Sequence, residues 1–440
     1  MFKSRSGSMT YLISLLVGFA FLYTSLTLHF REKCYADPTS YFYQPRRAHQ
    51  APYSTHRIQQ ATRYAAGLGS SLRNVDPSTH HQIAYKMSSP PPEICIGVPS
   101  VTRPGISYLK TTLGSMQDTL TSSQRSTLHF VVLLAHTNQS EHEDHGTPWL
   151  EAMADTVLSY DLPSDDGSRI AVAQMMEENG IHAVKSKFDY AITLEECVRT
   201  GAEWVMMLED DVVFREGWLD KVRGALQEVD KKTRGMGMDE FLYLRLFYYE
   251  GLLGWNSESW PKYIGISTLL TALTTFLTYL LLCPLRRLLN NYLSVPIRNP
   301  SPATLLFPLL TTPLLIALYF LAGAPCLQSP AHGVSLMPSH GCCGQGLVFP
   351  RSTVQDHLLP YFREHKWSET PVDSFIEEFA RDAESQGLWL GRWAVTPVVL
   401  QHVGTTSSHG VVRDGGFGDT MPDGIWNFGF ERNEVTGESV

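Results

Sequence analysis

Short apolar runs alternate with amphipathic helical patterns along much of the chain. The runs predict buried strands because each has three to ten apolar-rich residues bounded by Gly, Pro or polar residues. They lie at residues 94–98, 128–135, 204–208, 241–246, 347–349 and 394–403. Helical patterns lie at residues 54–72, 107–120, 186–200 and 370–387. Strands that alternate with helices in this way predict an α/β fold whose sheet has crossover connections.

Two of these helices carry clear sequence signals. In residues 186–200, Phe188, Ala191, Leu194 and Val198 share one face, and Gly201 follows where a helix C-cap is expected. Residues 370–373 read Thr-Pro-Val-Asp, which is a capping-box pattern with Pro at the first helical position.

Three long stretches without Lys, Arg, Asp or Glu predict membrane-spanning helices at residues 11–30, 263–283 and 304–324. Each approaches the length of about 20 residues that a helix needs to cross a bilayer. The second stretch is rich in Thr, whose hydroxyls can bond back to helix carbonyls or face the third stretch. The third contains Pro308 and Pro313. A buried core helix is the alternative for each stretch, and it fits the second comparably well.

Basic residues predict the orientation of these helices. Lys3 and Arg5 precede the first stretch, and Arg286, Arg287 and Arg298 lie between the second and third. The positive-inside rule places both basic segments in the cytosol, so the remaining segments are lumenal. The predicted organisation is a cytosolic tail at 1–10, a signal anchor at 11–30, a lumenal stem at 31–90, a first catalytic part at 91–262, a spanning helix at 263–283, a cytosolic loop at 284–303, a spanning helix at 304–324, and a second catalytic part with the tail at 325–440.

Charge and cysteine content narrow the class of protein. The formal net charge is −9, and no Lys/Arg block alternates with aromatic residues, which argues against a nucleic-acid partner.

Six of the seven cysteines fall in segments predicted to be lumenal, where disulfides form. Cys95 and Cys197 lie in apolar runs and also fit buried thiols, whereas the adjacent Cys342 and Cys343 either form a vicinal disulfide or bond elsewhere. Asn138 begins an Asn-Gln-Ser sequon that would be glycosylated in the lumen.

The strongest candidate for chemistry is Glu209-Asp210-Asp211, which directly follows the apolar run 204–208. Three neighbouring carboxylates repel one another unless a cation lies among them. Mg²⁺ and Mn²⁺ prefer such oxygen ligands and bridge them to substrate phosphates. The triplet alone fits a metal–diphosphate site and a solvated acidic loop equally well.

Two later residues and one turn extend this candidate site. His402 ends the apolar run 394–403, where an imidazole can join a metal held by carboxylates, although a core histidine fits the same pattern. Asp373 lies in the first turn of a helix, where the backbone field favours its ionised form, either as a catalytic base or as a capping acid. The glycine-rich turn at residues 341–346 allows close approach of backbone to a ligand, or only turns the chain.

At this point the chain resembles a known family. The order of elements resembles a GT-A glycosyltransferase, with a Rossmann-like mixed sheet. The segments WVMMLEDDVVFREGWLDKV, GCCGQGLVFPRS, TPVDSFIEEFA and TPVVLQHVGTTSS together resemble the post-GPI-attachment N-acetylgalactosaminyltransferases. These are Golgi enzymes whose GT-A domain is interrupted by a transmembrane hairpin, and the resemblance covers residues 90–410.

The resemblance implies roles for individual residues. Glu209 and Asp211 match the outer acids of the DXD motif, which bind Mn²⁺ (or Mg²⁺) and the UDP diphosphate, and His402 matches a histidine that completes the metal shell. The motif here is Glu-Asp-Asp, which leaves open whether Glu209 binds the metal directly or through water. Other implied contacts to the nucleotide sugar are Pro99, Ser100, Thr102, Arg103, Lys187, Asp189 and Asp210, and Gly341, Gly344 and Gln345 belong to the implied acceptor loop.

The expected function is transfer of GalNAc from UDP-GalNAc to a mannose of the GPI glycan. Inversion at the sugar requires a base on the face opposite the leaving group, for which Asp373 is the candidate, with Glu377 one turn behind it. Two spanning helices within the catalytic sequence would hold the site against membrane lipids at the lumenal leaflet, which suits a lipid-linked acceptor. The alternatives are a GlcNAc, galactose or mannose transferase acting on lipid- or N-linked glycans, and a non-catalytic membrane scaffold that keeps the fold.

Overall fold

The computed structural model describes residues 3–48, 50, 52–72, 90–103, 105–160, 168–238, 240–293, 302–337, 343–405 and 425–433. The chain forms two compact units. Unit one comprises Met1–Gln50 and Glu250–Pro330, and unit two comprises Ala51–Tyr249 and Ala331–Val440.

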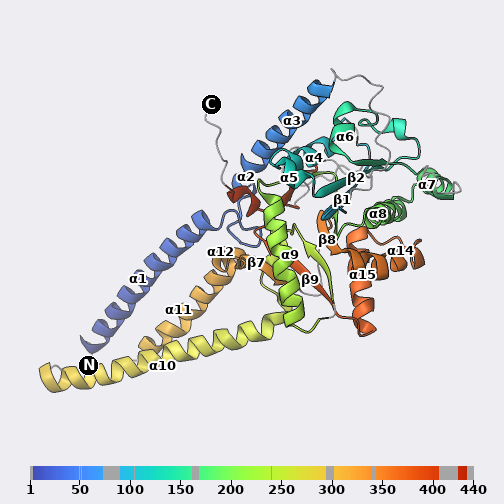
Figure 1. Ribbon diagram of the computed structural model, residues 1–440. Helices are drawn as coiled ribbons and strands as arrows, with labels where there is room; N and C mark the ends of the chain where they lie inside the picture. Colours follow the sequence, from blue (N-terminus) through green and yellow to red (C-terminus); the bar gives the residue numbers. More distant parts are fainter. Residues whose placement is uncertain are drawn as a thin grey trace. The chain divides into compact units, whose positions relative to one another are not determined.

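Unit one is built on three long helices, α1 (Lys3–Lys33), α10 (Trp260–Leu293) and α11 (Pro302–Leu321) (Figure 1). Its short helices are α2 (Pro45–Ala48) and α12 (Ala324–Leu327). Within the described residues, two segments are long and apolar enough to cross a membrane, Ile13–Lys33 and Glu250–Leu281. The third predicted span forms α11, whose apolar part, Leu305–Leu321, is shorter.

The threonines of α10 satisfy their hydroxyls in both of the predicted ways. The Thr275 hydroxyl donates to the Thr271 carbonyl at 2.7 Å, and the Thr278 hydroxyl donates to the Thr274 carbonyl at 2.8 Å. The Thr274 hydroxyl also lies 3.0 Å from that of Thr312 on α11. Polar side chains of α10 therefore bond to its own backbone and to α11, as an apolar environment requires.

Two disulfides join distant parts of the sequence, one in each unit. Cys34 bonds to Cys326 in unit one, and Cys95 bonds to Cys197 in unit two. The interpretation of Cys95 and Cys197 as buried thiols is therefore wrong: the run 94–98 and the helix 186–200 lie against each other and bring the two sulfurs together. Cys343 is also disulfide-bonded, and Cys342 lies outside the described residues.

The described strands of unit two form an eight-stranded mixed sheet with the order β3-β2-β1-β4-β8-β6-β9-β7. The strands are β1 (Ile94–Ser100), β2 (Leu128–Leu134), β3 (Thr156–Leu158), β4 (Trp204–Leu208), β6 (Glu240–Arg245), β7 (Gly333–Leu336), β8 (Gly346–Pro350) and β9 (Leu390–Thr396). The first four in this order are parallel, whereas β8 runs antiparallel to β4 and β6. Because β8 lies between β4 and β6, the sequences before and after the apolar pair α10 and α11 form one sheet.

A small second sheet positions the predicted histidine. Strand β5 (Val212–Phe214) pairs antiparallel with β10 (Leu400–His402), and the register places His402 opposite Val212. The sequence predicted one strand over residues 394–403, but β9 and β10 are separate. Pro397 lies between them and lacks the N–H that a continuous ladder would need.

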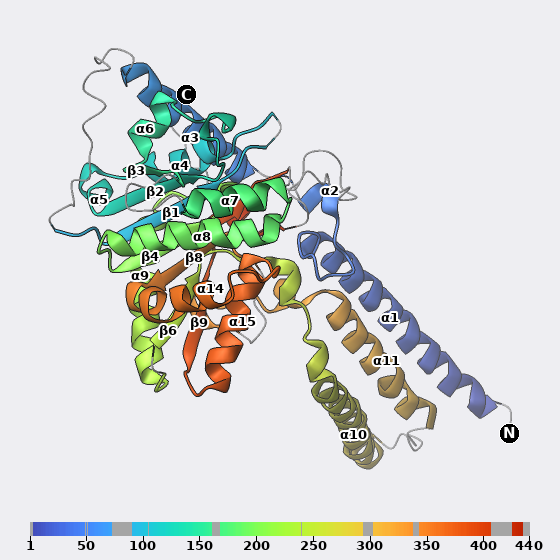
Figure 2. The ribbon, with the colours of Figure 1, turned by 90° about the vertical axis from the view of Figure 1, so that its right-hand side faces the viewer.

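Helices cover both faces of the large sheet. One face packs on α7 (Ser168–Glu178), α8 (His182–Arg199), α14 (Leu359–Glu364) and α15 (Val372–Ser385), which form the near layer in Figure 2. The other face packs on α4 (Leu109–Gln117), α6 (Pro148–Met153) and α9 (Trp218–Gly235). Strand β1 alternates accordingly: Ile94 and Ile96 belong to the α4 side and Cys95 to the α8 side. Short helices α5 (Ser122–Arg125) and α13 (Arg351–Thr353) complete the unit.

Helix α3 (Pro52–Leu72) packs within unit two, although the sequence placed residues 31–90 in a stem. Its Arg57 side chain is fully buried and donates two hydrogen bonds of 2.7 Å to the Asp118 carboxylate and one of 2.9 Å to the Phe214 carbonyl. Gly114 on α4 lets the helices approach, because a Cβ there would lie 2.7 Å from the Ala61 carbonyl oxygen. Unit two therefore includes a folded helix that begins well before residue 90.

The buried Arg57–Asp118 pair yields a stability prediction. Replacing Arg57 with Met should lower the free energy of unfolding of unit two by about 3–5 kcal/mol, because Asp118 would remain buried without its partner. The matched control is Arg223→Met, since Arg223 pairs with Glu93 at a partly exposed site and should cost no more than about 1 kcal/mol. Tryptophan fluorescence of the detergent-solubilised chain in urea measures both. Equal effects of the two substitutions would contradict the role given to Arg57.

Candidate active site

The three predicted metal ligands lie together at the carboxyl end of β4. Glu209, Asp211 and His402 each offer a ligand atom, and these atoms all lie within 4.8 Å of one another. We call these residues the carboxylate–imidazole cluster. Pairing of β5 with β10 brings His402 to Asp211, and the Val403 amide donates to the Asp211 carbonyl at 2.9 Å. Asp211 and His402 are buried, and Glu209 is the most exposed of the three.

Opposite charges hold the cluster together. Burial alone would raise the pKa of Asp211, but His402 and Arg103 hold it below its ordinary value. Burial opposes charge on His402, yet the Asp211 and Glu209 carboxylates raise its pKa above the ordinary value. Burial raises the pKa of Glu209 to about 7, and the Asp211 carboxylate adds to the rise. The site thus concentrates negative charge, which His402, Arg103 and the Gln345 amide partly offset.

The donor set of the cluster fits a divalent cation. The Asp211 Oδ1 atom is buried and has no hydrogen-bond partner among the described residues, and Asp211 Oδ2 lies 3.4 Å from His402 Nε2. Carboxylate oxygens are preferred ligands of Mg²⁺ and Mn²⁺, and an imidazole nitrogen commonly joins them on a transition metal. A buried carboxylate oxygen without a partner is costly, so a cation is the expected occupant of this position.

The position of Gly404 against Asp211 explains why a glycine follows His402-Val403. A Cβ atom at Gly404 would lie 2.2 Å from Asp211 Oδ2. No larger residue fits here while Asp211 keeps its place beside His402. The sequence alone did not indicate this role, although Gly404 is part of the segment TPVVLQHVGTTSS.

Asp210, the middle acid, faces a different set of partners. Its carboxylate accepts from Ser100 Oγ at 2.6 Å and pairs with Arg103 Nη2 at 2.7 Å. Burial raises the pKa of Asp210, and Arg103 opposes that rise. Arg103 Nη2 also lies 3.4 Å from Asp211 Oδ2, so this guanidinium bridges the acidic triplet to the loop after β1. Asp210 therefore fixes that loop beside the cluster.

The rest of the loop after β1 is held by histidines that the sequence analysis missed. The Thr102 amide donates to His136 Nε2 at 3.0 Å, and Ser100 Oγ lies 3.1 Å from His142 Nε2. Burial lowers the pKa of His142 to about 4, so this side chain is neutral. Pro99 pairs with Leu133 in the β1–β2 ladder. Only proximity in space, not spacing in sequence, connects these histidines to the triplet.

The turn before β8 lies directly beside Glu209. The Gln345 side-chain amide donates to Glu209 Oε2 at 3.1 Å, and the Glu209 amide donates to the Gln345 carbonyl at 3.2 Å. A Cβ at Gly344 would lie 3.3 Å from Asp373 Cβ and 3.6 Å from Glu209 Oε1. Gly344 thus separates Asp373 from the cluster by a thin layer of backbone. Gly341 and Cys342 lie outside the described residues.

The predicted capping box at Thr370 and Asp373 is wrong. Helix α15 begins at Val372, with Pro371 at the N-cap position, and no side chain caps it in the described part of the chain. The helix starts later than the pattern suggested, so Thr370 is too far from the first turn. Asp373 Oδ1 instead accepts from the Ser374 amide at 2.7 Å, and its side chain is partly exposed.

Glu377, one turn along α15, is held by two arginines. Arg245 Nη2 donates to its Oε1 at 2.9 Å, and Arg392 Nη1 donates to its Oε2 at 2.9 Å. The Tyr243 hydroxyl donates to the same carboxylate, and Arg245 also donates to the Cys343 carbonyl. Both oxygens of Glu377 are thus occupied, which suits anchoring of the turn before β8 and not proton abstraction.

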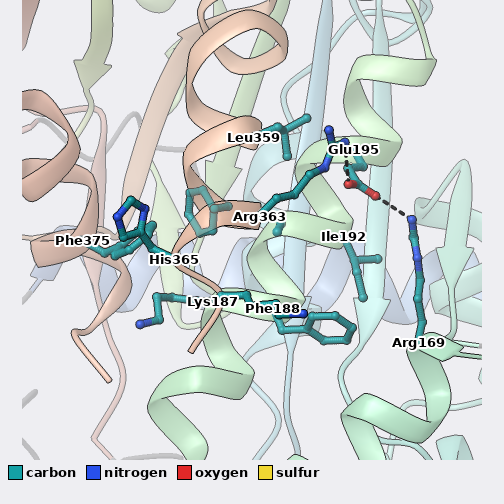
Figure 3. A pocket seen from close by; sticks show the side chains of 12 residues that line it. Arg169, Lys187, Phe188, Ile192, Glu195, Leu359, Arg363, His365 and Phe375 are labelled. Atoms are coloured by element: carbon teal, nitrogen blue, oxygen red, sulfur yellow. Dashed lines mark hydrogen bonds and ion pairs between the residues drawn. The ribbon is translucent and has the colours of Figure 1, made fainter. Parts of the chain in front are cut away.

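Lys187 and Asp189 lie on α8, apart from the cluster. Asp189 is buried and accepts from the Tyr160 hydroxyl at 2.6 Å and from Lys185 Nζ at 3.0 Å. Lys187 donates to the Ser368 carbonyl and lines a pocket between α8, α14 and α15, where Figure 3 shows it beside Phe188 and Phe375. The Glu209, Asp211 and His402 side chains do not line this pocket.

The predicted glycosylation residue Asn138 is exposed, and its Oδ1 accepts from the Ser140 hydroxyl at 2.7 Å. The sequon therefore lies at the surface of the described structure, and its glycosylation stays a prediction.

Carboxylates at the carboxyl end of a central strand, joined by an imidazole from the small second sheet, suit an enzyme that binds a cation together with a phosphorylated substrate. The chain matches the family model described as GPI-N-acetylgalactosamine transferase PGAP4 over residues 94–400. It therefore belongs to this family, which confirms the resemblance drawn from the sequence. No curated protein matches the chain. The family match supports a transferase whose acceptor is the GPI glycan.

Proposed function

We propose that this protein transfers GalNAc from UDP-GalNAc to a mannose of the GPI glycan in the Golgi lumen, with inversion at the sugar. The observation that carries the proposal is the position of Asp373 beside the carboxylate–imidazole cluster, in a chain that belongs to the GPI-N-acetylgalactosamine transferase family. Asp373 would supply a base next to a cation site, and the family membership indicates the class of acceptor.

Glu209, Asp211 and His402 would hold the cation, with Mn²⁺ or Mg²⁺ as the candidates. When bound, the cation would neutralise charge on the UDP diphosphate as the sugar departs. The buried Arg103 guanidinium, 3.4 Å from Asp211, keeps that carboxylate ionised and oriented. Gln345 orients Glu209 through its amide.

Asp373 is the proposed general base. It lies in the first turn of α15, close to Gly344 and Glu209. Its partial exposure leaves room for an acceptor hydroxyl, and its neighbour Glu377 is already occupied by arginines. Asp373 would take the proton from the attacking mannose hydroxyl, on the face opposite the departing UDP.

The apolar helices support a membrane-bound enzyme with a lipid-linked acceptor. We place the N-terminus in the cytosol and unit two in the lumen, with α1, α10 and α11 crossing the Golgi membrane. The Cys34–Cys326 and Cys95–Cys197 disulfides support a lumenal position of the segments that carry them, because such bonds persist in oxidising compartments.

A donor panel tests this proposal. The detergent-solubilised full chain should add one N-acetylhexosamine from UDP-GalNAc to purified GPI glycan, read by mass, at a rate at least about tenfold above those with UDP-GlcNAc or UDP-Gal. EDTA should abolish transfer and Mn²⁺ should restore it, because Arg103 is already paired with Asp210 and Asp211, which leaves a bound cation to balance the diphosphate. Transfer of a different sugar would identify another UDP-sugar transferase. The absence of transfer from every donor would favour the scaffold.

A further inference from the structure

Apart from atoms of the carboxylate–imidazole cluster itself, the Tyr190 hydroxyl and Gln345 Oε1 are buried polar atoms on the α8 side of the sheet without a hydrogen-bond partner among the described residues. Both residues are buried, Tyr190 on α8 and Gln345 just before β8. Buried polar atoms normally find partners, so unpartnered ones at an active site indicate a ligand that supplies them.

Alternation along the strands places these residues on one face of the sheet. Met207, Tyr243 and Leu347 of β4, β6 and β8 all pack in the core on the α8 side. Glu209, Arg245 and Gln345 each lie two positions along the chain from one of these residues, so their side chains point to the same face of the sheet. The Glu209–Gln345 backbone bond continues the β4–β8 ladder, which extends the alternation to these positions.

Tyr190 of α8 packs on the same face of the sheet. It belongs to the same core and stacks on Phe362 of α14 with ring centroids 5.9 Å apart. Burial raises its pKa well above the ordinary value, the Glu209 carboxylate raises it further, and Arg245 opposes the rise. The hydroxyl is therefore a neutral donor close to the charged end of the site.

The orientation of Gln345 leaves an acceptor free. Its Nε2 donates to Glu209 Oε2 at 3.1 Å. The Oε1 atom lies on the other branch of the amide and is the atom without a partner. The site thus presents one donor, from Tyr190, and one acceptor, from Gln345.

We propose that Tyr190 and Gln345 recognise the 2-acetamido group of the donor sugar. That group offers one N–H donor and one carbonyl acceptor, which matches Gln345 Oε1 and the Tyr190 hydroxyl respectively. The inference rests on the proposed function and explains how the site distinguishes a UDP-N-acetylhexosamine from a UDP-hexose, which has a hydroxyl at this position.

Calorimetric titration of the full-length chain in detergent with Mn²⁺ tests the proposal, using UDP, UDP-Gal and UDP-GalNAc as ligands. In Tyr190→Phe, which keeps the ring on Phe362, the preference for UDP-GalNAc over UDP-Gal should fall about tenfold, since the acetamido carbonyl loses its donor. The affinity for UDP should stay unchanged, because UDP has no sugar. Gln345→Met should also reduce the preference for UDP-GalNAc over UDP-Gal. Loss of the bond from Gln345 to Glu209 would weaken the binding of all three ligands equally and would not change this preference.

The matched control is Tyr361→Phe, which removes a hydroxyl that donates to Asp382 at 2.8 Å on the outer helices. It should leave the donor preference unchanged. An unchanged preference in Tyr190→Phe would overturn this inference and leave the proposed function intact. A wild-type chain that does not prefer UDP-GalNAc to UDP-Gal would overturn the inference and the proposed donor together.

Discussion

The double substitution Glu209→Ala/Asp211→Ala is expected to lower GalNAc transfer by at least about a thousandfold while the chain stays folded. Removal of both carboxylates leaves His402 as the only member of the carboxylate–imidazole cluster, and one imidazole does not hold Mn²⁺ against the diphosphate. Loss of a single group that stabilises transition-state charge already costs about 10²–10³ in rate. Transfer to GPI glycan in microsomes, read by mass, measures the effect.

The matched control replaces two exposed acids on α9, Asp220→Ala/Asp230→Ala, which changes the net charge equally. This control should keep wild-type transfer. Equal amounts of intact, membrane-bound protein for all three chains show that the loss is chemical. An unchanged GPI glycan profile with Glu209→Ala/Asp211→Ala would contradict an enzymatic role and support a scaffold.

Asp373→Asn is expected to reduce kcat by about 10²–10⁴, the usual contribution of a general base. The amide keeps the size of the side chain and its bond from the Ser374 amide, so the helix start should persist. The KM for UDP-GalNAc should change little, because Asp373 is proposed to act on the acceptor hydroxyl. Initial rates over a range of donor and acceptor concentrations separate the two effects.

Glu378→Gln is the isosteric control for Asp373→Asn on the same helix, and it should retain wild-type kcat. Glu377→Gln is expected to differ from both, since it would weaken the bonds to Arg245 and Arg392 and lower stability before it affects the proton transfer. If Asp373→Asn keeps wild-type kcat, Asp373 is only an acid that stabilises the first turn of α15.

The sequence predicted most of the central sheet because its strands are short apolar runs between turn residues. Six predicted runs correspond to β1, β2, β4, β6, β8 and the β9–β10 pair. It missed β3 and β7, which are short and have exposed positions such as Val157 and Leu336. It also assigned residues 54–72 to a stem, because a polar helix gives no sign that Arg57 is buried against Asp118.

The candidate cluster was predictable in part. The acidic triplet after one apolar run and His402 at the end of a second apolar run indicated the ligands. The structure brings Glu209, Asp211 and His402 together. The supporting residues were not predictable, because their roles depend on contacts across the fold. Gly404 makes room for Asp211. Arg103 pairs with Asp210, which therefore does not join Glu209 and Asp211 in the cluster. Glu377 has the spacing of a catalytic acid but is held by two arginines that lie far away in sequence.

The central claim is that residues on both sides of the apolar helix pair form one cation site for the nucleotide diphosphate. Mn²⁺ titration of the solubilised chain, followed by electron paramagnetic resonance with and without UDP, tests it directly. We predict one Mn²⁺ per chain, bound more tightly with UDP, and loss of this binding in Glu209→Ala/Asp211→Ala and in His402→Ala. Mn²⁺ binding that is identical in His402→Ala and the wild type, or independent of UDP, would contradict the account.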